Sequence, residues 1–110
     1  MKRTRSYSKV TRHALSILGK LIRLGRIERG MTAQDLADRA GISRATLYTI
    51  EKGKPGSEIG TVFEVAALAG VRLFGDDDRT LAMHQVRLDE KLTLLPKSVR
   101  PSKRDVDDDF

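Results

Sequence analysis

The segment from Met31 to Lys54 contains two short helical patterns of apolar residues, separated by a sharp corner. In the first pattern Leu36, Ala37 and Ala40 recur at the spacing that places them on one side of a helix. Thr32 precedes this helix, and its hydroxyl can cap the first turn, with Asp35 completing a short capping box. The pattern predicts a short amphipathic helix that starts after Thr32.

A second short helix is predicted from Arg44 to Lys52. Leu47 and Ile50 face the core at helical spacing, and Ser43 supplies an N-terminal cap. Gly41 stands at the corner between the two helices, where the chain needs a left-handed conformation that a side chain would resist. Two helices joined in this way predict a helix-turn-helix, in which the first helix braces the second so that its N-terminal residues reach the DNA major groove.

A longer helix is expected before this pair, over Ala14–Arg29. Its predicted core-facing stripe consists of Ala14, Leu18, Leu21, Ile22 and Gly25. A glycine inside a helix costs about 1 kcal/mol relative to alanine, so a close contact with another helix is expected at Gly25. Leu24 and Ile27 fall off the stripe.

Apolar residues continue after the pair in a different pattern. A helix is expected from Ser57 to Gly70, with both of its sides buried, and a further helix over Arg79–Leu95, ended by Pro96. Between them Val71, Leu73 and Phe74 belong to a four-residue segment with a period of two, which predicts a short strand. A lone strand needs a partner for its backbone, so these three residues are predicted to pair with the same strand of a second subunit.

These patterns predict an all-α fold: a compact four- to five-helix domain with a helix-turn-helix, and a short C-terminal strand that pairs across a dimer. The expected organisation is a basic flexible arm (1–13), the DNA-binding domain (14–70), a dimerisation strand and C-terminal helix (71–95), and a flexible acidic tail (96–110).

Charge is distributed unevenly along the chain. Residues 1–54 contain 13 Lys and Arg against 4 Asp and Glu, a net charge of +9, whereas residues 55–110 contain 8 against 11, a net charge of −3. A basic half attracts polyanions, so the N-terminal half is the expected nucleic-acid face. The alternative is a basic surface that serves only solubility.

The composition disfavours an enzyme. Cysteine is absent, His13 and His84 are far apart in dissimilar surroundings, and no phosphate-binding loop or nucleophile elbow is present. We interpret the acids Asp76, Asp77 and Asp78 as a solvated turn rather than a cation site. We therefore expect no catalytic residue, cofactor or metal. No apolar run is long enough to span a membrane, and a cytoplasmic protein, associated with the nucleoid when bound to DNA, is expected.

The predicted DNA contacts fall into two groups. Base edges are expected to meet Arg44, whose guanidinium can donate two hydrogen bonds to guanine, together with Ala45, Tyr48 and Thr49; for Tyr48 a structural or dimer role is the alternative. The starts of the two short helices, and the end of the second helix with the basic loop that follows it (residues 53–56), are expected to contact phosphates. The predicted residues are Thr32, Gln34, Ser43, Thr46, Lys52 and Lys54. Arg23 and Arg29 are interpreted as solvated charges that could assist.

Residues 18–70 resemble the Xre-type, phage-repressor-like helix-turn-helix regulators. The resemblance rests on Arg29-Gly30-Met31-Thr32, Asp35-Leu36-Ala37, Ala40-Gly41-Ile42-Ser43 and Ile50-Glu51-Lys52-Gly53, together with Ile22-Arg23 and Arg26. Gly25 departs from the family, which usually has leucine there. The resemblance implies an ion pair between Arg26 and Glu51 that holds the orientation of two helices more than it adds stability.

Outside this core the chain looks like the HipB-type antitoxins, which are encoded beside HipA-type serine/threonine kinase toxins. This second resemblance rests on residues 51–61, the segment 70–74, and the end of the chain from Leu95-Pro96-Lys97 to Asp107-Asp108-Asp109-Phe110. It implies a homodimer that binds an inverted-repeat operator, represses its own operon and binds the kinase.

Two other functions stay open at the level of sequence. One is a stand-alone Xre-family regulator without a toxin partner. The other is a protein-interaction module that works mainly through its acidic tail, which would become ordered on a basic partner.

Overall fold

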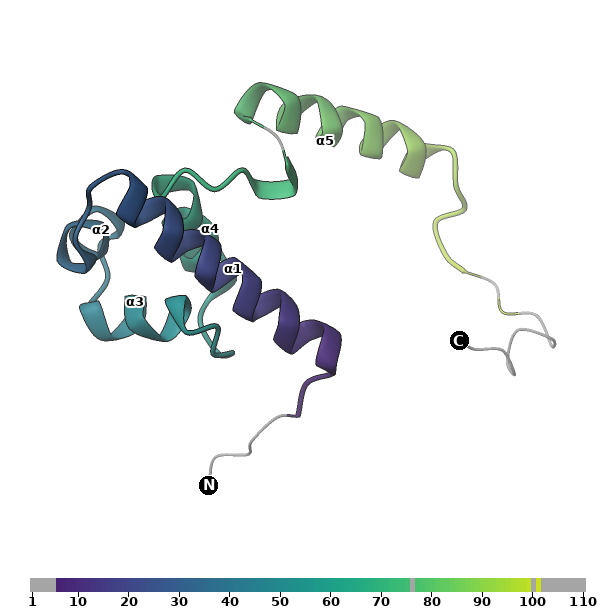
Figure 1. The fold of residues 1–110 in the computed structure, drawn as a ribbon. Helices are drawn as coiled ribbons and strands as arrows, with labels where there is room; N and C mark the ends of the chain where they lie inside the picture. Colours follow the sequence, from purple (N-terminus) through teal and green to yellow (C-terminus); the bar gives the residue numbers. More distant parts are fainter. Residues whose placement is uncertain (1–5, 76, 100, 102–110) are drawn as a thin grey trace. The chain divides into compact units, whose positions relative to one another are not determined.

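The computed structural model describes residues 6–75, 77–99 and 101. In this part of the chain the order of elements is α1 (Lys9–Glu28), α2 (Ala33–Ala40), α3 (Arg44–Glu51), α4 (Ile59–Leu68), the 3-10 turn η1 (Leu73–Gly75) and α5 (Asp78–Thr93). The chain divides into two compact units, one ending at Gly75 and one beginning at Asp76. The predicted all-α class is confirmed for the described residues (Figure 1).

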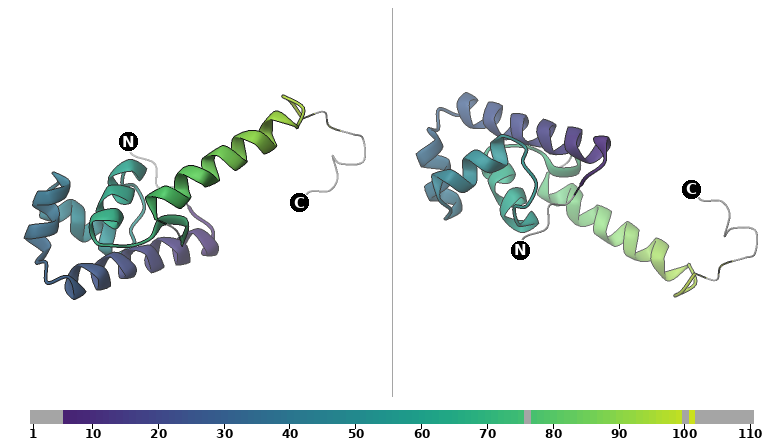
Figure 2. Two further views of the ribbon diagram at one scale, coloured as in Figure 1. Left: turned by 90° about the horizontal axis from the view of Figure 1, so that it is seen from above. Right: turned by 90° about the horizontal axis from the view of Figure 1, so that it is seen from below.

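The first unit packs four helices around one small core. α2 contacts both α3 and α4, and α1 contacts both α3 and α4. In the views of Figure 2, α2 lies beside the C-terminal end of α1. The buried apolar residues come from every helix of this unit and from the loop before α2: Ile22, Met31, Leu36, Ala37, Leu47, Ile50, Val65, Ala66 and Ala69.

α1 begins at Lys9, five residues earlier than predicted. The hydroxyl of Ser8 accepts a hydrogen bond from the Thr11 amide at 3.2 Å, which caps the first turn. No proline or glycine follows until Gly19, so the helix continues without interruption. Residues 9–13 are therefore helical rather than part of a flexible arm, and the arm's residues 1–5 lie outside the described residues.

The core-facing side of α1 also differs from the prediction. Ile22 is fully buried and Leu18 packs against the core, but Ala14 is exposed and Leu21 is 44% exposed. The buried side instead includes Gly19. A Cβ atom there would lie 2.5 Å from the carbonyl oxygen of Glu51, so the end of α3 approaches the backbone of α1 directly.

Gly25 makes the close helix contact that the sequence predicted. A Cβ atom at Gly25 would collide with the backbone carbonyl oxygen of Ala69, at the end of α4. The Gly25→Ala change would gain about 1 kcal/mol of helix propensity. The collision is with backbone, which cannot move aside cheaply, and overpacking costs about 1–3 kcal/mol.

We expect Gly25→Ala to lower the free energy of unfolding by about 1 kcal/mol net, because the collision outweighs the gain in propensity. The matched control is Gly60→Ala in α4, where a Cβ atom would meet nothing within 4 Å. This control should raise stability by about 0.5 kcal/mol. Urea denaturation of both variants checks the pair, and a stabilised Gly25→Ala protein would contradict the close contact.

The strand predicted over residues 71–74 is wrong. Leu73–Gly75 forms a single 3-10 turn, and Phe74 has a left-handed backbone with φ 54° and ψ 22°. Val71 and Leu73 are half-buried against the core of the same unit. Phe74 is 80% exposed, and its ring and that of Phe63 are nearly perpendicular, with a centroid distance of 6.2 Å. The alternation of apolar residues therefore reflects packing beside α4 and not a sheet.

α4 and α5 appear as helices close to the predicted bounds, with differences in burial. In α4, Val65 and Ala66 are buried, but Ile59 is 69% exposed and Gly60, Glu64 and Ala67 form an exposed side, so the prediction that both sides are buried is wrong. In α5, Asp77 caps the first turn through the Thr80 amide at 3.0 Å, and no residue of the helix is buried. Most of the tail, residues 100 and 102–110, lies outside the described residues.

Candidate nucleic-acid interface

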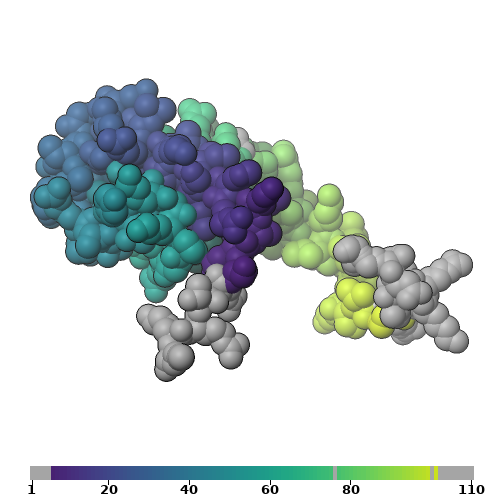
Figure 3. Space-filling view, turned by 60° about the horizontal axis from the view of Figure 1, so that its bottom comes forward, coloured from purple at the N-terminus to yellow at the C-terminus, as the bar shows by residue number. Residues whose placement is uncertain are grey.

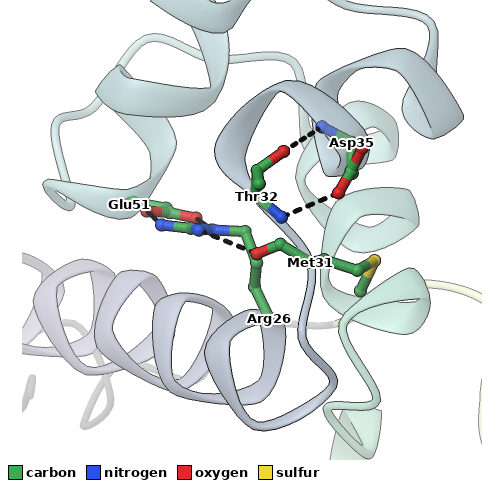
Figure 4. A network of polar contacts seen from close by, with 5 residues as sticks. All are labelled: Arg26, Met31, Thr32, Asp35 and Glu51. Atoms are coloured by element: carbon green, nitrogen blue, oxygen red, sulfur yellow. Dashed lines mark hydrogen bonds and ion pairs between the residues drawn. The ribbon is translucent and has the colours of Figure 1, made fainter.

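The corner between α2 and α3 forms as its sequence predicts. The Thr32 hydroxyl accepts from the Asp35 amide at 3.0 Å, and an Asp35 carboxylate oxygen accepts from the Thr32 amide at 2.9 Å, so both halves of the capping box are present (Figure 4). The hydrogen bond that the Thr32 amide donates holds the pKa of the Asp35 carboxyl group below its ordinary value. Gly41 ends α2 with φ 71°, and Ser43 caps α3 by accepting from the Thr46 amide at 3.1 Å.

The ion pair between α1 and α3 is also present. Arg26 Nε donates to Glu51 Oε2 at 2.8 Å, and Arg26 Nη2 donates to Oε1 at 3.1 Å, which makes the contact bidentate. Arg26 Nη1 donates in addition to the Met31 carbonyl oxygen at 3.1 Å, at the entrance to α2 (Figure 4). The hydrogen bond to Glu51 raises the pKa of Arg26 against the opposing effect of burial. One guanidinium therefore connects α1, the start of α2 and the end of α3.

α3 lies on the surface with its apolar side fixed by the core. Leu47 and Ile50 are 1% and 4% exposed, which determines how the helix is rotated about its axis. The opposite side therefore faces outward, with Arg44 and Ala45 exposed at the N-terminal end. In Figure 3 α2 in blue, α3 in teal and α1 in purple contribute to one surface.

Residues 22–74 match the model of a helix-turn-helix family. Within this segment, α2, the corner at Gly41 and α3 have the geometry of a helix-turn-helix. Over 43 residues the chain is 40% identical to an uncharacterized HTH-type transcriptional regulator of Methanocaldococcus jannaschii. That match covers 39% of this chain and 65% of the relative, so the chain spans less than two thirds of the relative's length.

Two of the residues predicted to contact phosphates, Lys52 and Lys54, lie beside Tyr48, which is predicted to contact bases. The ring of Tyr48 is 58% exposed, and the ammonium groups of Lys52 and Lys54 lie 5.4 and 5.9 Å from its centroid. Both distances fall within the range of cation–π attraction. The ring therefore holds two cations beside the outward side of α3, a role that the sequence did not indicate.

Several predicted polar contacts of the domain are already engaged in internal hydrogen bonds. The Thr49 hydroxyl donates to the Ala45 carbonyl oxygen at 3.1 Å, and the Gln34 amide donates to Asp38 at 2.7 Å. The Ser43 hydroxyl donates to Thr46 at 3.0 Å. To contact DNA, these side chains must leave their present hydrogen-bond acceptors or use their own acceptor atoms. The ammonium groups of Lys52 and Lys54 need no such exchange.

A groove between α1 and α3 adds two cations to this surface: Lys20, to which the sequence gave no role, and Arg23, interpreted from the sequence as a solvated charge that could assist DNA contact. The groove has a volume of about 550 Å³, and Lys20 and Arg23 of α1 line it opposite Arg44 and Tyr48 of α3 and Lys52, which directly follows α3. Their signal in the sequence was present but weak: both are polar positions of α1 three residues apart. Only the packing of α1 against α3 shows that they face the same groove as Arg44.

Other kinds of site find little support in the described residues. Within residues 6–75, 77–99 and 101, no cluster of three or more His, Cys, Asp or Glu side chains could hold a metal ion. None of the helices in this part of the chain combines the length and the apolar character needed to cross a bilayer.

Proposed function

We propose that this chain is a sequence-specific DNA-binding transcriptional repressor. The observation that supports this most directly is the outward side of α3, where an exposed Arg44 stands at the N-terminal end of a helix-turn-helix domain's second helix. That is the end which reaches base edges in this arrangement. The net charge of +9 over residues 1–54 provides the attraction to DNA.

The proposed contacts divide by chemistry. Arg44 donates two hydrogen bonds to the O6 and N7 atoms of guanine, and the methyl groups of Ala45 and Thr49 contact thymine. Tyr48 lies against the backbone or a thymine methyl. Phosphates are bound by the helix starts and by the lysines next to Tyr48, through Thr32, Gln34, Ser43, Thr46, Lys52 and Lys54.

We expect Arg44→Ala to cost about 1–3 kcal/mol of binding free energy at one base position in each half-site. The matched control is Lys54→Ala, which also removes one cation but should weaken binding to all sequences alike, because phosphate contacts do not distinguish bases. Fluorescence anisotropy with a selected operator and its single-base variants separates the two effects. Equal relaxation of specificity in both variants would refute this division of roles.

The proposed repressor acts as a homodimer. One eight-residue recognition helix covers only a few base pairs, whereas two helices about 34 Å apart on one face of DNA read an inverted repeat. Val71, Leu73 and Phe74 do not form a strand that could pair across the dimer. On α1 of the first unit, however, several apolar side chains are exposed: Val10, Ile17, Leu21, Leu24 and Ile27. Binding of two protomers per operator by analytical ultracentrifugation tests the dimer.

The proposed biological role is that of an antitoxin which binds a HipA-type kinase toxin and represses their shared operon. Its support is the resemblance to HipB-type antitoxins in residues 51–61, 70–74 and 95–110. A kinase encoded beside this gene should co-purify with the tagged chain when both are expressed. A stand-alone regulator would leave the kinase unbound, and a module that works mainly through its tail would bind the kinase without binding DNA.

A further inference from the structure

The groove between α1 and α3 is strongly cationic. Among the residues that line it, Lys20 and Arg23 come from α1, Arg44 comes from α3, and Lys52 directly follows α3. All four side chains belong to exposed residues. The lining also contains one carboxylate, that of Glu51.

The carboxylate of Glu51 does not neutralise these four cations, because both of its oxygens already accept from Arg26. The Lys20 ammonium donates to the Ser16 hydroxyl at 3.0 Å, a neutral partner that leaves its charge uncompensated. The groove is therefore a positive site with a net charge of +4 from its lining side chains, after the bound pair is set aside.

The shape and position of the groove favour a phosphate strand as its occupant. Arg44 and Tyr48 line the groove and also lie on the side of α3 that faces outward, so the groove opens beside the proposed base-reading residues. Ala33, the first residue of α2, lines it as well, and the start of a helix adds positive potential from its backbone amides. A backbone that passes the end of α3 therefore meets positive charge on both walls.

We infer that the groove binds consecutive backbone phosphates of DNA, and that Lys20 and Arg23 extend the interface from the helix-turn-helix onto α1. This inference rests on the proposed DNA binding. It adds Lys20 as a contact residue and assigns a phosphate contact to Arg23, which the sequence left as a solvated charge that could assist. The same phosphate chemistry occurs in free nucleotide polyphosphates, which are the second source of such a ligand. The contacts involve charge and not base edges, so they act on every sequence alike.

The test measures binding of the full chain to a fluorescein-labelled duplex of mixed sequence over about 50–200 mM salt. The variant is K20Q/R23Q. Each phosphate contact contributes about 0.9 to the slope of log affinity against log salt, so two lost contacts should lower the slope by about 1.8 for each bound protomer. Raising the salt over this range lowers the affinity of both proteins. For each bound protomer, this loss should be about ten times smaller for the variant than for the wild-type protein.

The matched control is R39Q/R72Q, which removes the same charge from two exposed arginines that do not line the groove. Its slope should stay close to that of the wild-type protein, and K20R/R23K should also keep the wild-type slope. Circular dichroism melting curves confirm that all variants are folded. Anisotropy with labelled ATP as the probe tests the second source of phosphate.

The possible results have distinct meanings. A lowered slope in K20Q/R23Q alone supports the inference. Equal slopes in K20Q/R23Q, its control and a wild-type protein that binds the duplex would overturn the inference and leave the proposed function intact. Binding of labelled ATP through Lys20 and Arg23 with an unchanged duplex slope would also overturn it. A wild-type protein that binds no duplex would refute the proposed function itself.

Discussion

Replacing Arg26 with methionine should lower the free energy of unfolding by about 3 kcal/mol. The side chains of Arg26 and Glu51 are only 12% and 9% exposed. Removing the guanidinium leaves the carboxylate of Glu51 nearly buried without its bidentate partner, and the Met31 carbonyl oxygen also loses a donor. A buried charge without a partner costs far more than the net contribution of an intact pair. Urea denaturation monitored by circular dichroism measures the loss.

A double-mutant cycle distinguishes this penalty from a simple loss of packing. Arg26→Met combined with Glu51→Gln removes both charges, so the double variant should recover about 1–3 kcal/mol relative to the sum of the single variants. Arg39→Met is the matched control on the exposed side of α2 and should change stability by about 0.5 kcal/mol or less. Strict additivity of the two changes would contradict a coupled pair.

Leu47→Ala should cost about 3–4 kcal/mol of unfolding free energy, which is roughly half the stability of a domain of this size. Leu47 is 1% exposed, and among the described residues the largest fully buried side chains are those of Ile22, Leu36, Leu47 and Val65. A cavity at this position has few neighbouring side chains to fill it. Thermal denaturation should show a lower midpoint, and DNA binding should weaken because Leu47 determines the orientation of α3.

The matched control for Leu47→Ala is Leu24→Ala in α1, where the same atoms are removed from a side chain that is 52% exposed. In the monomer this change should cost less than about 1 kcal/mol. A loss at Leu24 as large as that at Leu47 would show that Leu24 is buried in solution.

The sequence was most informative where structure depends on neighbouring residues. The caps at Thr32 and Ser43, the capping box with Asp35 and the left-handed glycine at the corner were all predicted and are all present. Each depends on a side chain that reaches a backbone group within three residues, or on the backbone freedom of one glycine. Such interactions need no information from distant parts of the chain.

The sequence was least informative where apolar residues have a choice of neighbours. The alternation in residues 71–74 predicted a strand, but Val71 and Leu73 pack against the core and the chain turns at Phe74. In α1 the predicted stripe included Leu21, which is 44% exposed, and missed Gly19, where α3 approaches the helix backbone. The helical period gives the spacing of residues on one face. Where apolar residues lie on several sides of a helix, the period does not determine which side is buried.

By itself, the sequence determined the two short helices, their caps and the corner between them, because these depend on local hydrogen bonds and backbone conformation. The resemblance to helix-turn-helix regulators added the pairing of Arg26 with Glu51, which no local pattern contains. The tertiary structure alone decided which side of α1 is buried, the turn at Phe74, and the meeting of Lys20 and Arg23 with Arg44 across one groove. These outcomes depend on how helices distant in sequence pack, and packing is decided by the shapes of all the contacting surfaces together.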